Sequence, residues 1–413
     1  MISVAEALAL ALEGVGPLDR HEAVPLRECI GRTLAEDVVA TRNQPPFPAS
    51  AMDGYAVRLS EARNGASLPV AGTSRAGESF AGSMPARSAL RIFTGARVPD
   101  GADAILIQEN AEPASDGTIR VVHAPEAGRY VRPEGFDFRR GDVLARRGQV
   151  VDAGLATLLA TASFDHPSLV ARPRVAVIST GDELVPLGSE PGRDEIVASS
   201  VHGVIAILRE AGAEAFDLGI ARDTVDDLER SLGLADEAEA DLVVTLGGAS
   251  VGDHDLVRPV LARRGVAMSF EEVAMRPGKP LMLGRQSGRT YIGLPGNPVS
   301  SLVCARIFLA PVVARMLGRT HVHDWREGVL GAELPPNDER EEFMRARVEL
   351  TDAGHLEVHA FSRQDSSLVS RYAAADALLH RPAHAGVGHV GDNCRFIALR
   401  ALAPFGSVVA TRR

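Results

Sequence analysis

The chain has 413 residues, a formal net charge of −10 and 45% hydrophobic residues, so it lacks the basic excess that nonspecific binding to nucleic acid or to an anionic membrane requires. Three widely separated cysteines, without a Cys-x-x-Cys pair, argue against a disulfide scaffold and a thiolate metal site. Because no basic-then-apolar segment opens the chain and no stretch approaches the roughly 18 apolar residues of a spanning helix, we expect a cytoplasmic protein.

The first part of the chain is predicted to be helical and the next part β-rich. Ser3 and Glu6 have the spacing of a capping box before an Ala/Leu-rich run, and a second helical segment is expected over residues 27–35. From about residue 45 to 138, short apolar runs alternate with Gly, Pro, Ser and Asp, as at 90–93, 104–107 and 118–122. We expect a compact β-rich module there.

From residue 171 the pattern changes to strand-like apolar runs that alternate with capped helices. The expected strands are 175–178, 215–218, 242–246 and 290–293, and the expected helices are 200–211, one opened by Thr224 and Asp227, and one through 303–307. This alternation predicts a parallel sheet wound with helices. After about residue 319 β-like runs return, at 345–350 and 395–399, which predicts a small terminal β domain.

Ligands of an open parallel sheet bind beyond the carboxyl ends of its strands. Three predicted strands lead into 179–183, 247–253 and 294–300, and each of these loops combines glycines with polar side chains. Glycines let the backbone approach a phosphate and expose consecutive N–H groups, so a phosphate-bearing ligand is favoured over ordinary turn chemistry. Four carboxylates in or just after these loops favour a hard divalent cation between them and the phosphate: Asp182, Glu183, Asp253 and Asp255.

Lys279 is the only lysine among 44 basic residues. It lies in Met-Arg-Pro-Gly-Lys-Pro, residues 275–280, where two prolines and a glycine shape the backbone around Arg276 and Lys279. An ammonium is a compact point charge, whereas a guanidinium is a planar fork, so a lone lysine indicates a small anion held at close range. The alternative is a solvated lysine in a turn.

Two further motifs are set aside because of their context. Residues 386–391 match Gly-x-Gly-x-x-Gly, but they follow no predicted strand and open into a β-like run, so a turn is expected. His321 and His323 have no third ligand at motif spacing, so solvated histidines are expected and no zinc site is predicted.

In this order, the segments resemble the molybdopterin molybdenumtransferase family, the MoeA proteins and the E domain of gephyrin. The resemblance rests on Pro-Phe-Pro-Ala-Ser-Ala-Met-Asp-Gly-Tyr-Ala-Val at 46–57, Arg-Ile-Phe-Thr-Gly-Ala at 91–96, and Leu-Pro-Gly-Asn-Pro-Val-Ser at 294–300. It covers almost the whole chain.

The resemblance implies an α/β multidomain fold. Its parts would be an elongated discontinuous N-terminal domain (1–44 plus 139–171), an inserted β-rich domain (45–138), a wound α/β molybdopterin-binding domain (172–325) and a C-terminal small β barrel (326–413). It also implies an L-shaped homodimer with a shared active site, in a cleft between the α/β part of one subunit and the β-rich module of the other. A molybdopterin adenylyltransferase and recipient molybdoenzymes would be further partners.

The implied reaction uses adenylylated molybdopterin and molybdate. The adenylate linkage is hydrolysed, molybdenum is delivered to the dithiolene, AMP is released, and a divalent cation, expected to be Mg²⁺, assists. A tungstate-using paralogue and a non-catalytic scaffold that keeps the fold are the alternatives.

The resemblance assigns site residues position by position. Molybdate would be bound by cations and hydroxyls: Arg276, Lys279, Ser300, Arg345 and Ser366. The catalytic set would be Lys279, Asp253, Glu183 and Asp53, and the metal ligands Glu183, Asp253 and Asp255. The nucleotide and pterin would contact Thr94, Asp137, Thr180, Gly181, Asp182, Asp223, Gly247, Gly248, Ser250, Gly252, Pro295, Gly296 and Asn297.

Three positions depart from the family pattern. Arg276 stands where a lysine is usual, Ser199 and Ser200 stand where a Ser-Asn pair is usual, and Asp365 stands where a glycine is usual ahead of Ser366. A carboxylate at 365 would weaken dianion binding unless it points away or pairs with Arg363 or Arg345.

Overall fold

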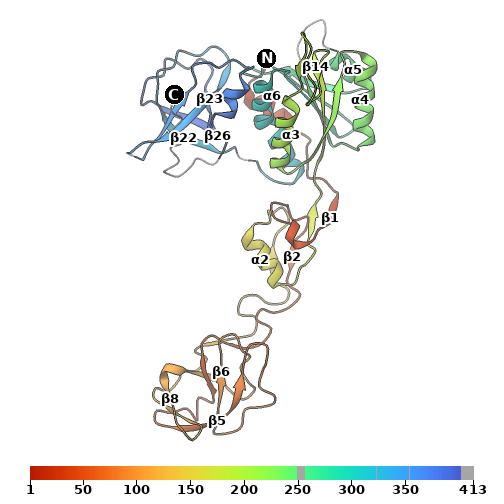
Figure 1. Cartoon of the computed structure of the whole chain (residues 1–413). Helices are drawn as coiled ribbons and strands as arrows, with labels where there is room; N and C mark the ends of the chain where they lie inside the picture. The colour runs from red at the N-terminus through yellow and green to blue at the C-terminus, as the bar shows by residue number, and fades with distance from the viewer. Residues whose placement is uncertain (249–255, 322, 353, 401–413) are drawn as a thin grey trace. The chain divides into compact units, whose positions relative to one another are not determined.

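The computed structural model describes residues 1–248, 256–321, 323–352 and 354–400. The chain divides into two compact units, Ala23–Leu169 (unit 2) and Met1–Glu22 with Val170–Arg413 (unit 1). Figure 1 shows the chain leaving unit 1 near its beginning and returning to it after unit 2. Short strands stand where the chain passes between the units: β1 (His21–Ala23) and β12 (Ser168–Val170).

Unit 2 holds the predicted β-rich module, which is confirmed. One of its sheets has the strand order β7-β4-β6-β5-β9-β8. The elements are η1 (Leu26–Glu28), β2 (Val38–Val39), β3 (Ala49–Ser50), β4 (Gly54–Val57), β5 (Ser67–Ser74), β6 (Ala89–Ile92), β7 (Ala104–Ile107), η2 (Gln108–Asn110), β8 (Ala111–Pro113), β9 (Thr118–Val121), β10 (Val131–Arg132), β11 (Val143–Ala145) and α2 (Ala153–Thr161).

The prediction of a helix over residues 27–35 is wrong. The segment makes one 3-10 turn, η1, and then runs irregularly past Gly31, whose φ is +75°. Its backbone pairs with a distant segment instead: the Leu34 N–H donates to the Gln149 carbonyl oxygen (2.9 Å), and the Val151 N–H donates to the Arg32 carbonyl oxygen (2.8 Å). Backbone groups that bond across the chain in this way are not available for a helical ladder.

Unit 1 begins with α1 (Val4–Leu12), where the predicted capping box between Ser3 and Glu6 is present. The other elements of its α/β part are β13 (Arg174–Thr180), β14 (Leu184–Val185), β15 (Ile196–Val197), α3 (Ser200–Ala211), β16 (Glu214–Ala221), α4 (Val225–Glu237), β17 (Leu242–Leu246), α5 (Val257–Arg263), β18 (Ala267–Glu272), β19 (Met275–Arg276), β20 (Pro280–Gln286), β21 (Arg289–Leu294), α6 (Pro298–Cys304), the π-helical turn η3 (Ala305–Leu309) and α7 (Ala310–Met316).

The main sheet of the α/β part has the order β16-β13-β17-β21-β20-β18. The strands β16, β13, β17 and β21 pair in parallel as predicted, but β20 and β18 add antiparallel pairings that the sequence reasoning did not predict. The hairpin between β20 and β21 turns at Ser287 and Gly288, which both have positive φ. A Ser-Gly pair is a recognised hairpin signal, so the sequence did contain an indication of this hairpin.

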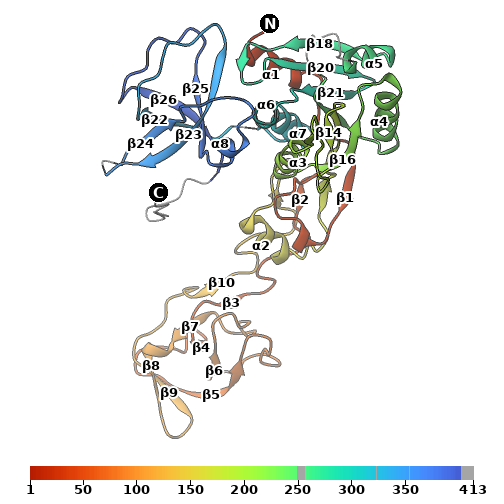
Figure 2. The same ribbon diagram turned by 45° about the horizontal axis from the view of Figure 1, so that its top comes forward.

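Helices cover both faces of this sheet (Figure 2). Ala176 and Ile178 of β13 pack with Leu228 and Leu232 of α4 and with Val260 of α5. On the other face α3 packs against β13 and against α6 and α7. Because both faces are covered, successive residues of β13 are apolar, as a buried parallel strand requires.

The helical run Pro298–Met316 is long and apolar enough, by length and composition, to cross a membrane. The expectation that no stretch approaches that length is therefore wrong. However, 89% of its most apolar window is buried inside the protein, as in the core helix of a soluble domain.

The terminal β domain is a closed barrel, as predicted. Its strands follow the order β23-β24-β22-β26-β25, and β25 pairs back with β23. The elements are β22 (Trp325–Leu330), β23 (Glu341–Leu350), β24 (Leu356–Ala360), α8 (Val369–Ala373), β25 (Ala377–Arg381) and β26 (Asn393–Ala398). β19 of the α/β part pairs in parallel with β23 and joins the barrel to the α/β part.

Candidate functional site

The three predicted loops begin at one edge of the main sheet, because β13, β17 and β21 are parallel neighbours. The Gly247 N–H donates to the Leu294 carbonyl oxygen (3.0 Å), and the Thr180 hydroxyl donates to the Leu246 carbonyl oxygen (3.4 Å). A side chain on Gly248, which has a φ of +61°, would place its Cβ 2.4 Å from Val257 Cγ2. This position therefore requires glycine because of both its backbone conformation and its packing.

A cavity of about 400 Å³ opens at this edge. Predicted substrate-binding residues and the predicted metal ligand Glu183 line it, together with the two serines that depart from the family pattern. The lining includes Thr180, Glu183, Ser199, Ser200, Pro295, Gly296 and Asn297. Ser200 and Asn297 bring hydroxyl and amide groups to the ends of the strands. The cavity therefore suits a polar ligand bound at the carboxyl ends of parallel strands.

Two glycines of the predicted phosphate loops do not offer free N–H groups. Gly181 donates to the Ala221 carbonyl oxygen (3.2 Å), and Gly247 donates to that of Leu294. Both glycines have positive φ and so allow the chain to turn at the ends of the strands. The donors for a phosphate must therefore come from other groups.

The acidic residues of the edge have different surroundings. The Asp182 carboxylate accepts from the Asp223 N–H (3.1 Å), which ties the two predicted residues together. Glu183 is exposed and lines the cavity. The other acidic and loop residues predicted here, Asp253, Asp255, Ser250 and Gly252, lie outside the described residues.

Within the described part of the chain, no group of three or more His, Cys, Asp or Glu side chains could hold a metal ion. Since two of the three predicted ligands lie outside that part, the predicted cation site stays a prediction. Glu183 has the hard oxygen donors that a divalent cation prefers.

Arg276 is the last residue of β19, and Lys279 lies in the turn that connects β19 to β20. The Val273 N–H donates to the Lys279 carbonyl oxygen (3.0 Å) and closes the turn, and the Arg276–Pro277 peptide is cis. Gly278 has a φ of +116°, and a Cβ on it would lie 2.4 Å from the Cys304 sulfur in α6. The turn is therefore packed directly on α6.

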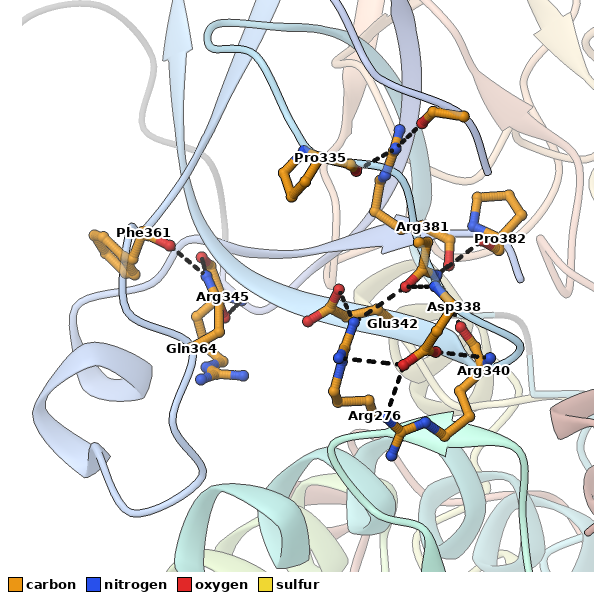
Figure 3. Close-up of polar contacts among 12 residues, drawn as sticks. Arg276, Pro335, Asp338, Arg340, Glu342, Arg345, Phe361, Gln364, Arg381 and Pro382 are labelled. Atoms are coloured by element: carbon orange, nitrogen blue, oxygen red, sulfur yellow. Dashed lines mark hydrogen bonds and ion pairs between the residues drawn. The ribbon is translucent and has the colours of Figure 1, made fainter. Parts of the chain in front are cut away.

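The two cations, Arg276 and Lys279, have different partners. Lys279 Nζ lies 3.2 Å from the Glu272 carboxylate in β18, and its side chain is 45% exposed. Arg276 contacts the barrel, where it donates to Asn337 Oδ1 (3.1 Å). Its guanidinium also pairs with Glu342 (2.9 Å) and Asp338 (3.4 Å), as Figure 3 shows.

Arg345 is a buried cation in β23, with only 1% of its surface exposed. Its Nη2 donates to the Asp365 carbonyl oxygen (3.1 Å), while its buried Nε has no hydrogen-bond partner among the described residues. Burial lowers the pKa of Arg345, and the nearby carboxylates of Glu342 and Asp365 oppose that shift. A cation buried in surroundings of low dielectric constant attracts an anion strongly, so Arg345 is suited to bind one.

The barrel segment that follows β24 reaches the start of α6. The Val299 N–H donates to the Ser366 carbonyl oxygen (3.1 Å), so Ser366 lies beside the first turn of α6, where Ser300 is buried. Since α6 also packs under the turn that holds Lys279, one helix contacts two of the three segments with predicted molybdate residues. The third segment is β23, which carries Arg345.

In unit 2, Asp53 and Thr94 lie together. The Asp53 carboxylate accepts from the Thr94 N–H (2.7 Å) and from its hydroxyl (2.8 Å). These bonds, together with the charge of Arg91, lower the pKa of Asp53. Asp137 is exposed, and its N–H donates to the Gln44 carbonyl oxygen (2.9 Å).

Three family models match consecutive parts of the chain: the MoeA N-terminal region (domains I and II) at residues 2–163, a probable molybdopterin binding domain at 176–315, and the MoeA C-terminal region (domain IV) at 327–399. A molybdopterin molybdenumtransferase of Haemophilus influenzae is 33% identical over 384 residues, which cover 92% of this chain and 94% of the relative. The chain belongs to the molybdopterin molybdenumtransferase family.

Other members of the family agree with this assignment. Molybdopterin molybdenumtransferase 2 of Mycobacterium tuberculosis is 34% identical over 342 residues, with 79% of this chain and 83% of the relative covered. A crystal structure of a molybdopterin biosynthesis MoeA protein from Pyrococcus horikoshii has a TM-score of 0.84 at 26% identity, with 97% of this chain and all of that chain covered. The resemblance stated from the sequence is confirmed.

Asp365, which stands where the family usually has glycine, has a carboxylate that is hydrogen-bonded to a nearby residue. It accepts from the Ser367 hydroxyl (2.6 Å) and from the Ser367 N–H (2.8 Å), and these bonds and the charge of Arg345 lower the pKa of Asp365. Arg345 bonds to the backbone carbonyl of the same residue. The side chain of Asp365 is thus held by Ser367 while its main chain holds Arg345.

The motif at 386–391 contains a bridge at 388 and a turn at 390–391 and opens no helix, as expected. The expectation of solvated histidines is wrong: His321 and His323 are partly buried, with ring nitrogens 3.1 Å apart. Burial, aided by His321, lowers the pKa of His323 to about 4.

Several residues that support this site were missed by sequence reasoning. Gln364 holds the backbone of Arg345 from both sides, accepting from its N–H (2.9 Å) and donating to its carbonyl oxygen (2.9 Å). Glu272 lies opposite Pro280 in the antiparallel pairing of β18 and β20. Only a prediction of that pairing would have placed Glu272 beside Lys279, whereas Gln364 belongs to no motif.

Proposed function

We propose that this chain inserts molybdenum from molybdate into adenylylated molybdopterin, with hydrolysis of the adenylate linkage and release of AMP. Its relatives over most of the chain bear the name of this activity, so tungstate use and a purely scaffolding role are not favoured. One structural observation supports the proposal most directly: α6 contacts both the turn that carries Lys279 and the segment that carries Ser366.

In this proposal the oxyanion is bound beside α6. Lys279 and Arg345 offset the charge of the dianion, and the hydroxyls of Ser300 and Ser366 supply directed donors. Burial of Arg345 strengthens its attraction for an anion, because the surroundings have a low dielectric constant. The pterin nucleotide occupies the adjacent cavity at the strand ends, along Thr180, Gly296 and Asn297.

A divalent cation, proposed to be Mg²⁺, would be held by Glu183 with Asp253 and Asp255. When bound, such a cation neutralises phosphate charge and makes the phosphorus easier for water to attack. Glu183 lines the cavity and would orient the cation toward a phosphate there.

We further propose that the protein is cytoplasmic and acts as a homodimer. The family resemblance implies that Asp53, Thr94 and Asp137 of one subunit complete the site of the other. A molybdopterin adenylyltransferase would supply the adenylylated substrate, and molybdoenzymes would receive the product.

The test is AMP release from adenylylated molybdopterin, with molybdate and the divalent cation titrated separately. We expect molybdate to stimulate release by the wild type, and Lys279→Ala to reduce it about 100-fold or more, the usual effect of removing one group that stabilises an anion. Arg230→Ala removes an exposed cation on α4 and serves as the control, with an effect within about twofold. Absence of AMP release from the folded wild type would refute the proposed activity.

The same assay tests the shared site. Inactive Asp53→Ala and Lys279→Ala subunits, mixed and allowed to exchange, should regain activity, because a mixed dimer keeps one intact site. If mixing restores nothing although mixed dimers form, both residues act within one subunit.

A further inference from the structure

Arg276 ends β19 and Lys279 follows three residues later in the turn, yet their side chains have different kinds of partners. Lys279 pairs with the Glu272 carboxylate at 3.2 Å. Arg276 reaches three acceptors, Asn337 and Asp338 before β23 and Glu342 within it. A single exposed ion pair is easily exchanged for another anion, whereas a guanidinium with several acceptors is held in one orientation.

The acceptors of Arg276 are themselves fixed (Figure 3). The Asn337 amide donates to the carbonyl oxygens of Arg340 (2.8 Å) and Pro382 (2.9 Å). The Asp338 carboxylate accepts from the Arg340 guanidinium (2.8 Å) and from its N–H (3.0 Å). The segment that receives Arg276 is therefore braced against the end of β25 by contacts that do not involve Arg276.

The backbone adds to this junction. In the parallel pairing of β19 with β23, Arg276 lies opposite Glu342, and the Glu341 N–H donates to the Ala274 carbonyl oxygen (2.9 Å). Arg345 follows three residues later on the same strand, where Gln364 holds its backbone. The position of Arg345 relative to the turn of Lys279 therefore depends on how β23 is attached to β19.

We propose that Arg276 is a positioning residue. Through Asn337, Asp338 and Glu342 it anchors the barrel strand that carries Arg345, while Lys279 is the turn cation that leaves its carboxylate partner to contact the oxyanion. This inference rests on the proposed function, and it reassigns one residue of the molybdate set expected from the resemblance. A lysine at 276 could not reproduce the anchor, because one ammonium on a shorter stem cannot span three acceptors.

Two isosteric substitutions distinguish the roles: Glu272→Gln and Glu342→Gln. Glu272→Gln removes the partner of Lys279, so the KM for molybdate should fall about twofold to fivefold with kcat unchanged, the range of an exposed ion pair. Glu342→Gln loosens the anchor, so kcat/KM should fall about 10-fold to 100-fold, as expected for a displaced binding group. Glu271→Gln, beside Glu272 but paired with Arg258, is the charge-matched control and should leave the KM within about twofold.

Variants of Arg276 complete the test. Arg276→Gln should resemble Glu342→Gln, and the double variant should be no worse than the worse single one, because both changes remove the same contact. Arg276→Lys should stay near Arg276→Gln in its KM for molybdate. Two results would show that Arg276 is an oxyanion ligand and that the inference is wrong. One is a lower KM for molybdate in Glu342→Gln, like that expected for Glu272→Gln, and the other is Arg276→Lys with wild-type kinetics.

Thermal unfolding of the same variants separates this inference from the proposed function. Arg276→Gln and Glu342→Gln should show a non-additive loss in the unfolding midpoint of unit 1, whereas Arg276→Gln and Glu272→Gln should be additive. Additivity of the first pair would overturn the anchor. A wild type without AMP release but with this coupling would overturn the proposed function and keep the anchor.

Discussion

At the scale of single residues, Asp365 is a carboxylate that the sequence places unfavourably beside a predicted anion site. In the structure it has a hydrogen-bonding role within its own turn. Its carboxylate accepts two hydrogen bonds from Ser367, and its carbonyl oxygen receives the guanidinium of the buried Arg345. The sequence suggested that this carboxylate would repel a dianion. In the structure the carboxylate is already hydrogen-bonded within the turn before α8. The residue has a structural use that glycine could not supply.

We predict that Asp365→Gly lowers the thermal stability of the protein and has only a small effect on anion binding. The KM for molybdate should change by less than about fivefold, the range of one exposed charge. Since the folded pKa of Asp365 lies below its ordinary value, its contribution to stability is fully present above that ordinary value and is lost as the pH falls through the folded pKa. The midpoints of wild type and variant should thus differ at neutral pH and converge in acid.

Thermal unfolding at several pH values and molybdate titrations check this prediction. Ser367→Ala is the control, because it removes the hydroxyl donor and keeps the carboxylate. A fall of more than about tenfold in the KM for molybdate would show that the carboxylate faces the oxyanion, since an exposed pair cannot account for that much.

At the scale of elements, the turn from β19 to β20 depends on Gly278. This residue combines a φ of +116° with a position against the buried Cys304 sulfur, where a Cβ would lie 2.4 Å away. Relief of such a contact requires the turn, α6 or the buried Cys304 side chain to shift. A shift of the turn would displace Lys279, the next residue.

Gly278→Ala should destabilise unit 1 by about 2–4 kcal/mol, the combined cost of backbone strain and overpacking. Gly288→Ala is the matched control: its φ of +83° is also positive, but a Cβ there would meet no atom of the described residues within 4 Å, so only the strain remains, about 1 kcal/mol. Chemical denaturation measures both variants. Adding Cys304→Ala to Gly278→Ala should recover part of the loss, and equal losses for the two glycine variants would contradict the packing argument.

At the scale of the whole molecule, the two units have separate cores. One cluster in unit 2 joins Val57, Leu106 and Ile119, and one cluster in unit 1 joins Ile178, Leu232 and Val260. Each of these clusters lies inside a single unit. Cores that do not share side chains can unfold independently.

We therefore predict two transitions in differential scanning calorimetry of the full chain. Addition of molybdate and AMP should shift the transition of unit 1, which holds the strand-end cavity, because a ligand stabilises the part that binds it. Arg230→Ala is a suitable control for the ligand shift. A single transition whose calorimetric and van't Hoff enthalpies agree would show that the units unfold as one.

Much of the fold and of the candidate site could be predicted from local sequence. The capping box at Ser3, the helix opened by Thr224 and the hydrophobic strands that end at Thr180, Leu246 and Leu294 are all present, because capping and periodicity act within a few residues. The parallel order of those strands brings the starts of the predicted loops to one edge.

The tertiary structure alone decided the features that depend on distant partners. Residues 27–35 do not form the expected helix, because their backbone groups bond to residues 149–151. Strands β18 and β20 are antiparallel members of the main sheet. The roles of Arg276 and Lys279 look alike in the sequence, since both are cations beside Pro and Gly. They differ only because the fold places three barrel acceptors around Arg276 and a β18 carboxylate beside Lys279, and the energy of a charged group is set by its neighbours in space.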